Sequence, residues 1–205
     1  MIQIIMAMSL GFMFAGTVMA IEEPEFTIEK KMENYEIRSY PSVLVAETVV
    51  EATFEDSGNK AFRILADFIF GNNVSQTKIA MTAPVSQQAA ATSEKIAMTA
   101  PVGQQKTSGG FLVQFTMPAQ FTLETLPKPV DPRVTIRLLP PRRVAVFSYS
   151  GFWSESRFLS KLEEFRQMLV SDGLKATGEP VFARYNSPFQ LWFLRRNEIW
   201  LDLEG

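Results

Sequence analysis

The sequence predicts an α+β domain made of two like halves. Short runs of alternating apolar and polar residues indicate strands, and two longer runs with helical periodicity indicate helices. The order strand, strand, helix, strand occurs twice along the chain, which favours one sheet system with two helices packed on it. The chain has 205 residues, of which 46% are hydrophobic and 20% are charged. This composition is that of an ordinary globular protein, and the length is sufficient for a sizeable core.

Residues 1–20 form an apolar leader without a charged side chain. Its end, Val18-Met19-Ala20, has compact residues where a signal-peptide cleavage site requires them. We expect cleavage after Ala20, with residues 21–205 forming a single domain in the periplasm or outside the cell. The leader lacks the Lys or Arg that usually opens a signal peptide, and about 20 apolar residues can also span a bilayer. The alternative is therefore an uncleaved anchor that holds the domain at a membrane.

Three strands and a helix are predicted in the first half of the domain. The strands are residues 26–32, 35–40 and 42–50. Residues 59–70 are predicted to be helical, because apolar side chains recur on one face at i, i+3 and i+7: Phe62, Leu65 and Ile69. Asp56 or Ser57 can cap the start of this helix, and Gly71 can end it.

The second half repeats this order. A polar stretch, residues 72–110, leads into a strand at 111–117 and a proline-rich loop at 118–132. Further strands are predicted at residues 134–139, 143–149, 175–185 and 199–203. A helix is predicted at 154–171, and it stops at Asp172-Gly173. Its apolar stripe consists of Phe158, Leu162, Phe165 and Leu169.

The two halves are related by a weak sequence repeat. Tyr35-Glu-Ile-Arg-Ser-Tyr-Pro corresponds to Val134-Thr-Ile-Arg-Leu-Leu-Pro, and each is followed by a strand, an aromatic loop and a helix. Two such halves, packed with pseudo-two-fold symmetry, leave a groove between the sheet and the helices. Apolar grooves of this kind are the usual sites of small ligands.

One octapeptide occurs twice without change. Lys-Ile-Ala-Met-Thr-Ala-Pro-Val spans residues 78–85 and again residues 95–102. Apolar residues alternate in both copies, which predicts two strands. Because proline lacks an N–H, each copy is an edge strand or ends at its proline, and residues 86–94 can join the two copies as a hairpin. Two interpretations stay open. The apolar residues form the core of two related strands, or Met81 or Met98 lies in a ligand pocket, where a thioether packs well on a flat ring.

The absence of two residue types excludes several kinds of chemistry. The chain has no Cys and no His. Disulfides, thiolate catalysis, zinc–cysteine sites and iron–sulfur clusters are therefore excluded, and so are Ser-His-Asp and Cys-His mechanisms. We expect a protein that is not an enzyme, with no catalytic residue and no metal site. The formal net charge is −2 and the basic residues are scattered, so we expect no nucleic-acid partner.

The octapeptide resembles the motif of the SOUL/haem-binding protein family. The segment Pro-Phe-Gln-Leu-Trp-Phe-Leu-Arg-Arg-Asn-Glu-Ile-Trp, residues 188–200, is similar to the closing segment of that family. Tyr35-Glu-Ile-Arg, Phe115-Thr-Met-Pro and Gly151-Phe-Trp also fit, and the similarity runs from about Phe26 to Leu203. The resemblance implies a distorted β-barrel of two pseudo-symmetric halves, flanked by two α-helices.

The resemblance also implies a function. It is the non-catalytic, non-covalent binding of haem or another tetrapyrrole in an apolar groove, for sequestration or transport in the cell envelope. Because the chain has no His, such binding proceeds without a His ligand to the iron. We expect a monomer whose partner is a porphyrin or a similar hydrophobic small molecule. The alternative is a general effector- or amphiphile-binding module with the same two-half fold.

Six residues are candidates for binding the tetrapyrrole: Lys60, Phe62, Arg63, Met81, Met98 and Tyr185. Lys60 and Arg63 lie on the first helix, where the resemblance suggests basic residues that meet haem propionates; solvated surface charge is the alternative. Tyr185 can bind ferric haem as a phenolate, and packing in the core or at its rim is the alternative. Residues 195–198, Arg-Arg-Asn-Glu, are interpreted as an internal Arg–Glu pair or, alternatively, as an anion site.

Overall fold

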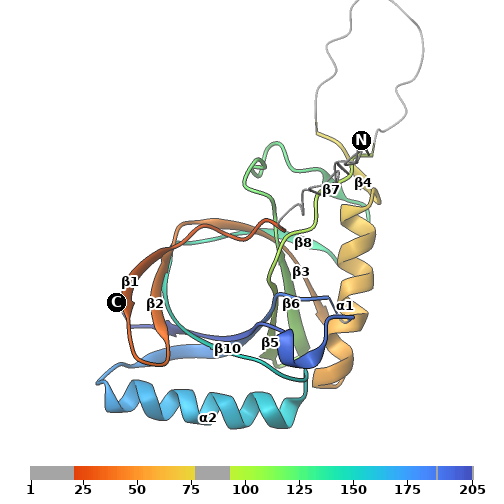
Figure 1. Cartoon of the computed structure of the whole chain (residues 1–205). Coiled ribbons are helices and arrows are strands. Elements are labelled where there is room, and N and C mark those ends of the chain that lie inside the picture. Colours follow the sequence, from red (N-terminus) through yellow and green to blue (C-terminus); the bar gives the residue numbers. More distant parts are fainter. Residues whose placement is uncertain (1–20, 77–92, 188, 205) are drawn as a thin grey trace, which may run out of the picture.

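The computed structural model describes residues 21–76, 93–187 and 189–204. It consists of a large antiparallel sheet with two helices, so the predicted α+β class is confirmed. Figure 1 shows the sheet curving strongly, with both helices against its convex side. We call this side the outer face of the sheet and the concave side its inner face.

Nine strands form the main sheet, in the order β1-β2-β9-β11-β10-β5-β6-β3-β8. Their bounds are β1 Thr27–Lys31, β2 Glu36–Tyr40, β3 Val43–Val50, β5 Val102–Thr107, β6 Gly110–Thr116, β8 Thr135–Leu139, β9 Arg142–Tyr149, β10 Ala176–Arg184 and β11 Asn197–Leu203. Two short strands, β4 (Asn73–Val74) and β7 (Lys128–Pro129), form a separate pair. Most predicted strands are present within a few residues of their expected bounds, whereas β5 lies in the polar stretch and begins only at the last residue of the second octapeptide.

The order of the strands shows the two halves. Apart from β1, the strand order is symmetric about the β10–β5 pair. In this symmetry β11 corresponds to β6, β9 to β3 and β2 to β8. The register agrees with this symmetry, because Ile37 of β2 pairs with Ala145 of β9 while Ile136 of β8 pairs with Ala46 of β3. The sequence repeat places Ile136 in the position of Ile37. Each half therefore supplies a strand to the other half.

The barrel implied by the family resemblance is not closed. Closure requires pairing between the edge strands β1 and β8, and the described residues show none. All five residues of β1 are exposed, and three of them are charged: Glu29, Lys30 and Lys31. Charged side chains on an exposed edge strand disfavour further pairing. The sheet is therefore a strongly curved, open one.

Helix α1 (Phe54–Ile69) begins one turn before the predicted start. Its N-cap is Thr53, whose hydroxyl accepts a hydrogen bond from the backbone N–H of Asp56 at 3.2 Å. The prediction of Asp56 or Ser57 as the cap was wrong, because Thr53 satisfies the free N–H and both residues lie inside the helix. Helix α2 (Glu155–Ser171) is capped by Ser154 and agrees with the predicted range.

The second octapeptide is not the predicted strand. Residues 95–101 have no strand of their own apart from a single parallel bridge between Glu22 and Thr99, and β5 begins at Val102. The backbone N–H groups of this segment donate elsewhere: Ile96 to the Ile69 carbonyl at 2.8 Å and Ala100 to the Glu22 carbonyl at 2.9 Å. The segment is thus a strap that ties α1 to the N-terminal residues. The first octapeptide and most of the expected hairpin lie outside the described residues.

The two faces of the sheet differ in chemistry. On the outer face, one apolar cluster lies under α2 and includes Phe165, Phe182 and Ile199, while a second lies under α1 and includes Leu65, Phe68 and Val113. The inner face carries a smaller apolar cluster around Tyr40, Val146 and Trp200. The buried charged side chains of Arg38 and Glu198 also lie on this inner face. The helices are thus held by apolar packing, whereas the concave side also contains ion pairs.

The buried stripe of α2 is expected to account for much of the stability. Phe165 is fully buried and its ring lies 5.4 Å from that of Phe147. We expect Phe165→Ala to lower the free energy of unfolding by about 3 to 5 kcal/mol, because the loss of a buried ring leaves a cavity. Urea denaturation measures this change. Leu159→Ala, at a half-exposed position of the same helix, is the control and should change it by less than about 1 kcal/mol.

Candidate functional site

Lys60 and Arg63 lie together on the exposed side of α1. They line a groove of about 460 Å³ against β3, with Val49, Val50 and Ile64 as its apolar residues. The Lys60 ammonium donates to the carbonyl of Glu51 at 3.3 Å. Within the described part of the chain, Arg63 has no hydrogen bond or ion pair. Two cations are therefore available to an anionic group on this side of the helix.

The groove also contains an ion pair that is already satisfied. Arg133 donates to both carboxylate oxygens of Asp131, and these hydrogen bonds lower the pKa of Asp131 to about 2. Asp131 is therefore ionised at neutral pH and neutralises Arg133. The other cations of the groove, Lys60 and Arg63, come from α1, and the carboxylates of Glu51 and Asp67 also line it, so its formal charges balance.

Phe62 and Met98 border one end of β6. The Phe62 ring, predicted to belong to the core stripe of α1, is 37% exposed and lies 5.6 Å from the ring of Phe115. Met98 is 40% exposed and precedes Thr99, whose hydroxyl donates to the carbonyl of Thr116. The Phe62 ring and the backbone next to Met98 thus lie near the same end of β6, and neither residue lines the groove of Lys60 and Arg63. Met81 lies outside the described residues.

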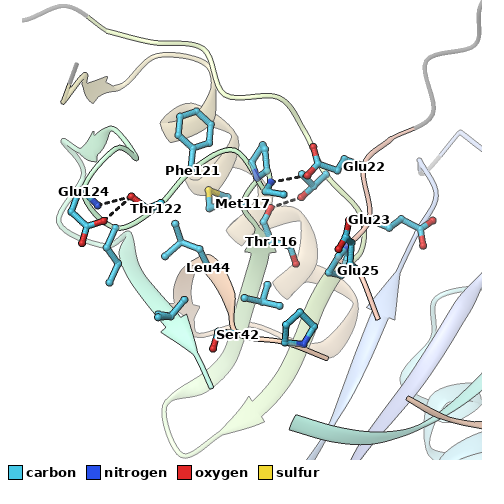
Figure 2. A pocket seen from close by; sticks show the side chains of 18 residues that line it. Glu22, Glu23, Glu25, Ser42, Leu44, Thr116, Met117, Phe121, Thr122 and Glu124 are labelled. Carbon is cyan, nitrogen blue, oxygen red and sulfur yellow. Dashed lines mark hydrogen bonds between the residues drawn. The ribbon is translucent and has the colours of Figure 1, made fainter. Parts of the chain in front are cut away.

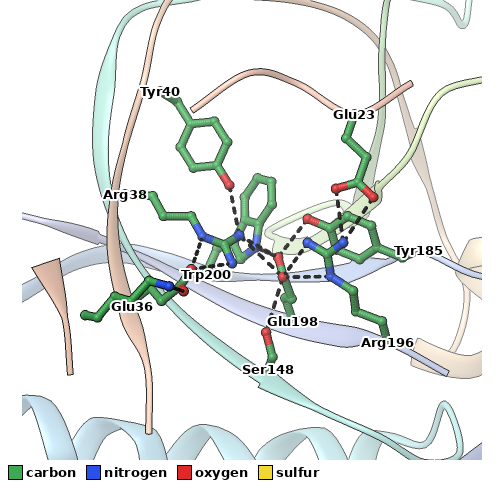
Figure 3. A network of polar contacts seen from close by, with 10 residues as sticks. Glu23, Glu36, Arg38, Tyr40, Ser148, Tyr185, Arg196, Glu198 and Trp200 are labelled. Atoms are coloured by element: carbon green, nitrogen blue, oxygen red, sulfur yellow. Dashed lines mark hydrogen bonds and ion pairs between the residues drawn. The ribbon is translucent and has the colours of Figure 1, made fainter. Parts of the chain in front are cut away.

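Tyr185 lies away from these residues, in a polar network on the inner face of the sheet (Figure 3). Its hydroxyl donates to Glu198 Oε2 at 2.7 Å, and the Arg196 guanidinium lies 3.6 Å from its ring centre. Burial and the charge of Glu198 raise the pKa of Tyr185 well above its ordinary value. The phenol is thus held neutral, and the structure does not bring it together with Lys60, Phe62 and Arg63.

Glu198 is the centre of this network. Its side chain is fully buried and accepts hydrogen bonds from five residues: Arg38, Ser148, Tyr185, Arg196 and Trp200. Burial alone raises the pKa of a carboxyl group, but the charges of Arg38 and Arg196 outweigh it, and the pKa of Glu198 is lowered. The Arg–Glu interpretation of residues 195–198 is therefore the one that the structure supports.

Asn197 and Arg195, which precede Glu198 in the sequence, also make contacts that stabilise the fold. Asn197 donates from its amide to the carbonyl of Gly151 at 3.1 Å and accepts from the Trp153 indole at 2.8 Å. Arg195 donates to the carbonyl of Gln190, and its guanidinium lies 4.4 Å from the ring centre of Trp153. Together these contacts hold the closing segment against the turn that precedes α2.

Arg184 is a buried cation that sequence reasoning did not single out. Its guanidinium lies among the rings of Phe54, Trp153 and Phe182, and it donates to Gln104 Oε1 at 2.6 Å. Burial lowers the pKa of Arg184 to about 10, so the group stays charged at neutral pH. The aromatic rings thus take the place of a carboxylate partner.

The closing segment exposes an unusual number of large apolar side chains. Those that are more than two-fifths exposed are Phe189, Leu191, Trp192, Phe193 and Leu194. Trp192 stacks on the exposed Phe152 ring, with 5.1 Å between ring centres. The 3-10 helix η1 (Trp192–Leu194) thus carries a second apolar surface, next to the turn that leads into α2.

The fold and these surfaces define the class of protein: an α+β domain of two like halves with its helices on the outer face. Solved structures share this fold at low sequence identity. The C-terminal domain of EcmrR superimposes with a TM-score of 0.58 at 12% identity, covering 85% of this chain and 99% of that domain. A hydrolase from Listeria innocua gives a TM-score of 0.53 at 12% identity, covering 86% of this chain and 94% of that one. At such identities only the fold is shared.

The particular family follows from the sequence. The chain belongs to the SOUL heme-binding protein family, whose model matches residues 21–202. Heme-binding protein 2 of Homo sapiens is 30% identical over 171 residues, which cover 82% of this chain and 77% of that protein. Heme-binding protein 2 of Mus musculus is 30% identical over 189 residues, covering 89% and 86% respectively. The family resemblance expected from the octapeptide and the closing segment is confirmed.

The lowered pKa of Glu198 predicts a pH-dependent stability. A carboxyl group whose pKa is lower in the folded chain stabilises it above the unfolded value of 4.5, and this stabilisation is lost as the pH falls through the folded value. We expect Glu198→Gln to cost about 3 to 5 kcal/mol at pH 7, because Arg38 then lies buried without its partner. Urea midpoints of both proteins from pH 7 to pH 3 test this. The difference between them should narrow below about pH 4.5; a constant difference contradicts the role of the charge.

Proposed function

We propose that the protein binds haem or a related tetrapyrrole non-covalently and catalyses no reaction on it. Membership of the SOUL heme-binding protein family carries this proposal. The names of the human and mouse relatives support it. The sequence has no His or Cys to coordinate iron, and the Tyr185 phenol is held neutral by its hydrogen bond to Glu198. Apolar contact and charge must therefore supply most of the affinity.

The outer side of α1 is the proposed site. Lys60 and Arg63 offer cations to the propionates in the groove, and Phe62 and Met98, which lie outside the groove lining, offer further exposed apolar surface to the ring. On the inner face, the cavity beside Tyr40 and Trp200 measures only about 30 Å³, which is too small for a porphyrin. The residues of the chain thus fit haem better outside the curved sheet than within it.

A haemin titration followed by the Soret band tests the function. We expect a saturable shift at micromolar haemin. Lys60→Glu together with Arg63→Glu is expected to weaken binding about tenfold, because the propionates lose two partners and meet two like charges. Phe62→Ala should weaken binding by a similar factor through the loss of apolar contact. Without a saturable shift in the unaltered protein, the proposed function is wrong.

Matched controls lie on α2, which corresponds to α1 in the other half. Lys161→Glu with Arg166→Glu imposes the same change of charge on the other helix, and Leu159→Ala removes a similarly exposed apolar side chain. These variants should bind haemin like the unaltered protein, and Tyr185→Phe should leave the position of the Soret band unchanged. If Trp192→Ala weakens binding and Phe62→Ala does not, the site lies on the closing segment instead.

We also propose that the protein acts in the cell envelope, as a monomer that sequesters or transports its ligand. The apolar leader and its Val-Met-Ala ending support export. In the part of the chain that the structure describes, neither helix is long and apolar enough to cross a membrane. An uncleaved leader remains the alternative and makes the protein membrane-attached.

Export makes a specific prediction about the mature chain. Cell fractionation followed by mass spectrometry of the N-terminal peptide should find the protein outside the cytoplasm, starting at Ile21. Ala20→Arg should block cleavage, because the last leader position requires a small side chain, and the longer form should then accumulate. A chain that still starts at Met1 and stays with the membrane fraction would establish the anchor.

A further inference from the structure

A second cleft lies at the opposite end of β3 from the α1 groove. It has a volume of about 620 Å³ and lies between residues 22–25, the first residues of β3 and the loop that follows β6 (Figure 2). This volume is within the range of about 300 to 1,000 Å³ that small-ligand sites have. It shares no lining residue with the groove of Lys60 and Arg63.

The floor of the cleft is apolar. Leu44 and Met117 are buried beneath it, and the Phe121 side chain is half-buried beside them (Figure 2). Leu123 and Leu138 also line it, and they are 49% and 50% exposed. A ligand with apolar rings would remove this leucine surface from water. A thioether and an aromatic ring are also favourable partners for a flat ring.

Every charged residue that lines the cleft is a glutamate: Glu22, Glu23, Glu25 and Glu124. Figure 2 shows the first three on one side and Glu124 on the other. Glu22 accepts from the Ala119 N–H and Glu124 from the Thr122 hydroxyl, both at 2.7 Å, so neutral donors leave these charges uncompensated. The Thr122 bond also lowers the pKa of Glu124.

The four glutamates are not equivalent. Glu23 is neutralised by Arg196, which lies outside the cleft and donates to both of its carboxylate oxygens at 3.0 and 3.1 Å. Glu25 has no ion pair or hydrogen bond among the residues that the structure describes. The cleft thus combines an apolar floor with about three uncompensated negative charges.

We propose that this cleft binds a small organic cation with an apolar ring system, at a site separate from that of haem. Charge complementarity selects this class of ligand, because a cation between Glu25 and Glu124 gains from both sides while its rings cover Leu123 and Leu138. A tetrapyrrole with two propionates is repelled by the same carboxylates. The apolar floor distinguishes the site from one for a small inorganic cation.

Fluorescence anisotropy with two dyes of similar ring system tests the proposal on the full chain. Rhodamine 6G is cationic, and fluorescein is anionic at neutral pH. We expect saturable binding of rhodamine 6G that weakens with added salt, and at least tenfold weaker binding of fluorescein. Glu25→Gln with Glu124→Gln should weaken rhodamine 6G about tenfold, since two exposed ion pairs are lost. Both positions are exposed, so the fold is retained.

A variant of equal net charge is the control. Glu33→Gln with Glu163→Gln removes two exposed carboxylates elsewhere and should leave the affinity for rhodamine 6G unchanged. Haemin should not displace rhodamine 6G, and Lys60→Glu with Arg63→Glu should not weaken the binding of rhodamine 6G. Equal binding of both dyes, an equal loss in the control, or stoichiometric displacement by haemin overturns the inference. Only displacement by haemin would also bear on where haemin binds; the other two results leave the proposed haem site untouched.

Discussion

A carboxylate that is removed from water must be paired and hydrogen-bonded, and the arrangement of this protein depends on how Glu198 meets that requirement. Its partners come from across the sheet: Arg38 from β2, Ser148 from β9, Trp200 from β11 and Tyr185 from the end of β10. Arg38 and Glu198 are separated by 160 residues along the chain. Because β2 belongs to the first half and β11 to the second, this one carboxylate joins the two halves on the inner face, as the exchanged strands do in the sheet itself.

The proposed site of a large ligand is inferred from this packing. With the inner face filled by the Glu198 network and its aromatic neighbours, surface for binding remains on the outside of the curve and at its ends. The helices cover most of the outer face, and their buried stripes hold Leu65 and Phe165 away from any ligand. What stays accessible is the margin of a helix, where Phe62 is only partly covered. The same half-exposure makes Phe62 a weak contributor to the core and a usable contact for a ring.

The sequence allowed most of the fold to be predicted, because apolar periodicity reports which face of an element is buried. The α2 range was confirmed, and the repeat of Ile37 and Ile136 agrees with the observed register. Periodicity cannot report what a backbone N–H will bond to, and the second octapeptide alternates like a strand while bonding to Ile69 and Glu22. The candidate residues on α1 could be proposed from one helix, whereas the partner of Tyr185 is set by the pairing of β10 with β11. Sequence reasoning also missed Arg184, since only the fold places three aromatic rings around it.

The acidic cleft and the α1 groove differ in the charges that line them. Glu23 pairs with Arg196, and Arg196 in turn pairs with Glu198, so the N-terminal residues that border the acidic cleft are tied to the central network. The strap of residues 95–101 fixes them from the other side through Ala100 and Thr99. Glu22 and Glu23 are therefore positioned by the core of the fold, while Lys60 and Arg63 extend from the exposed side of α1. The two proposed sites, one for a ligand with negative groups and one for a ligand with a positive group, thus lie on different parts of the same domain and share no lining residue.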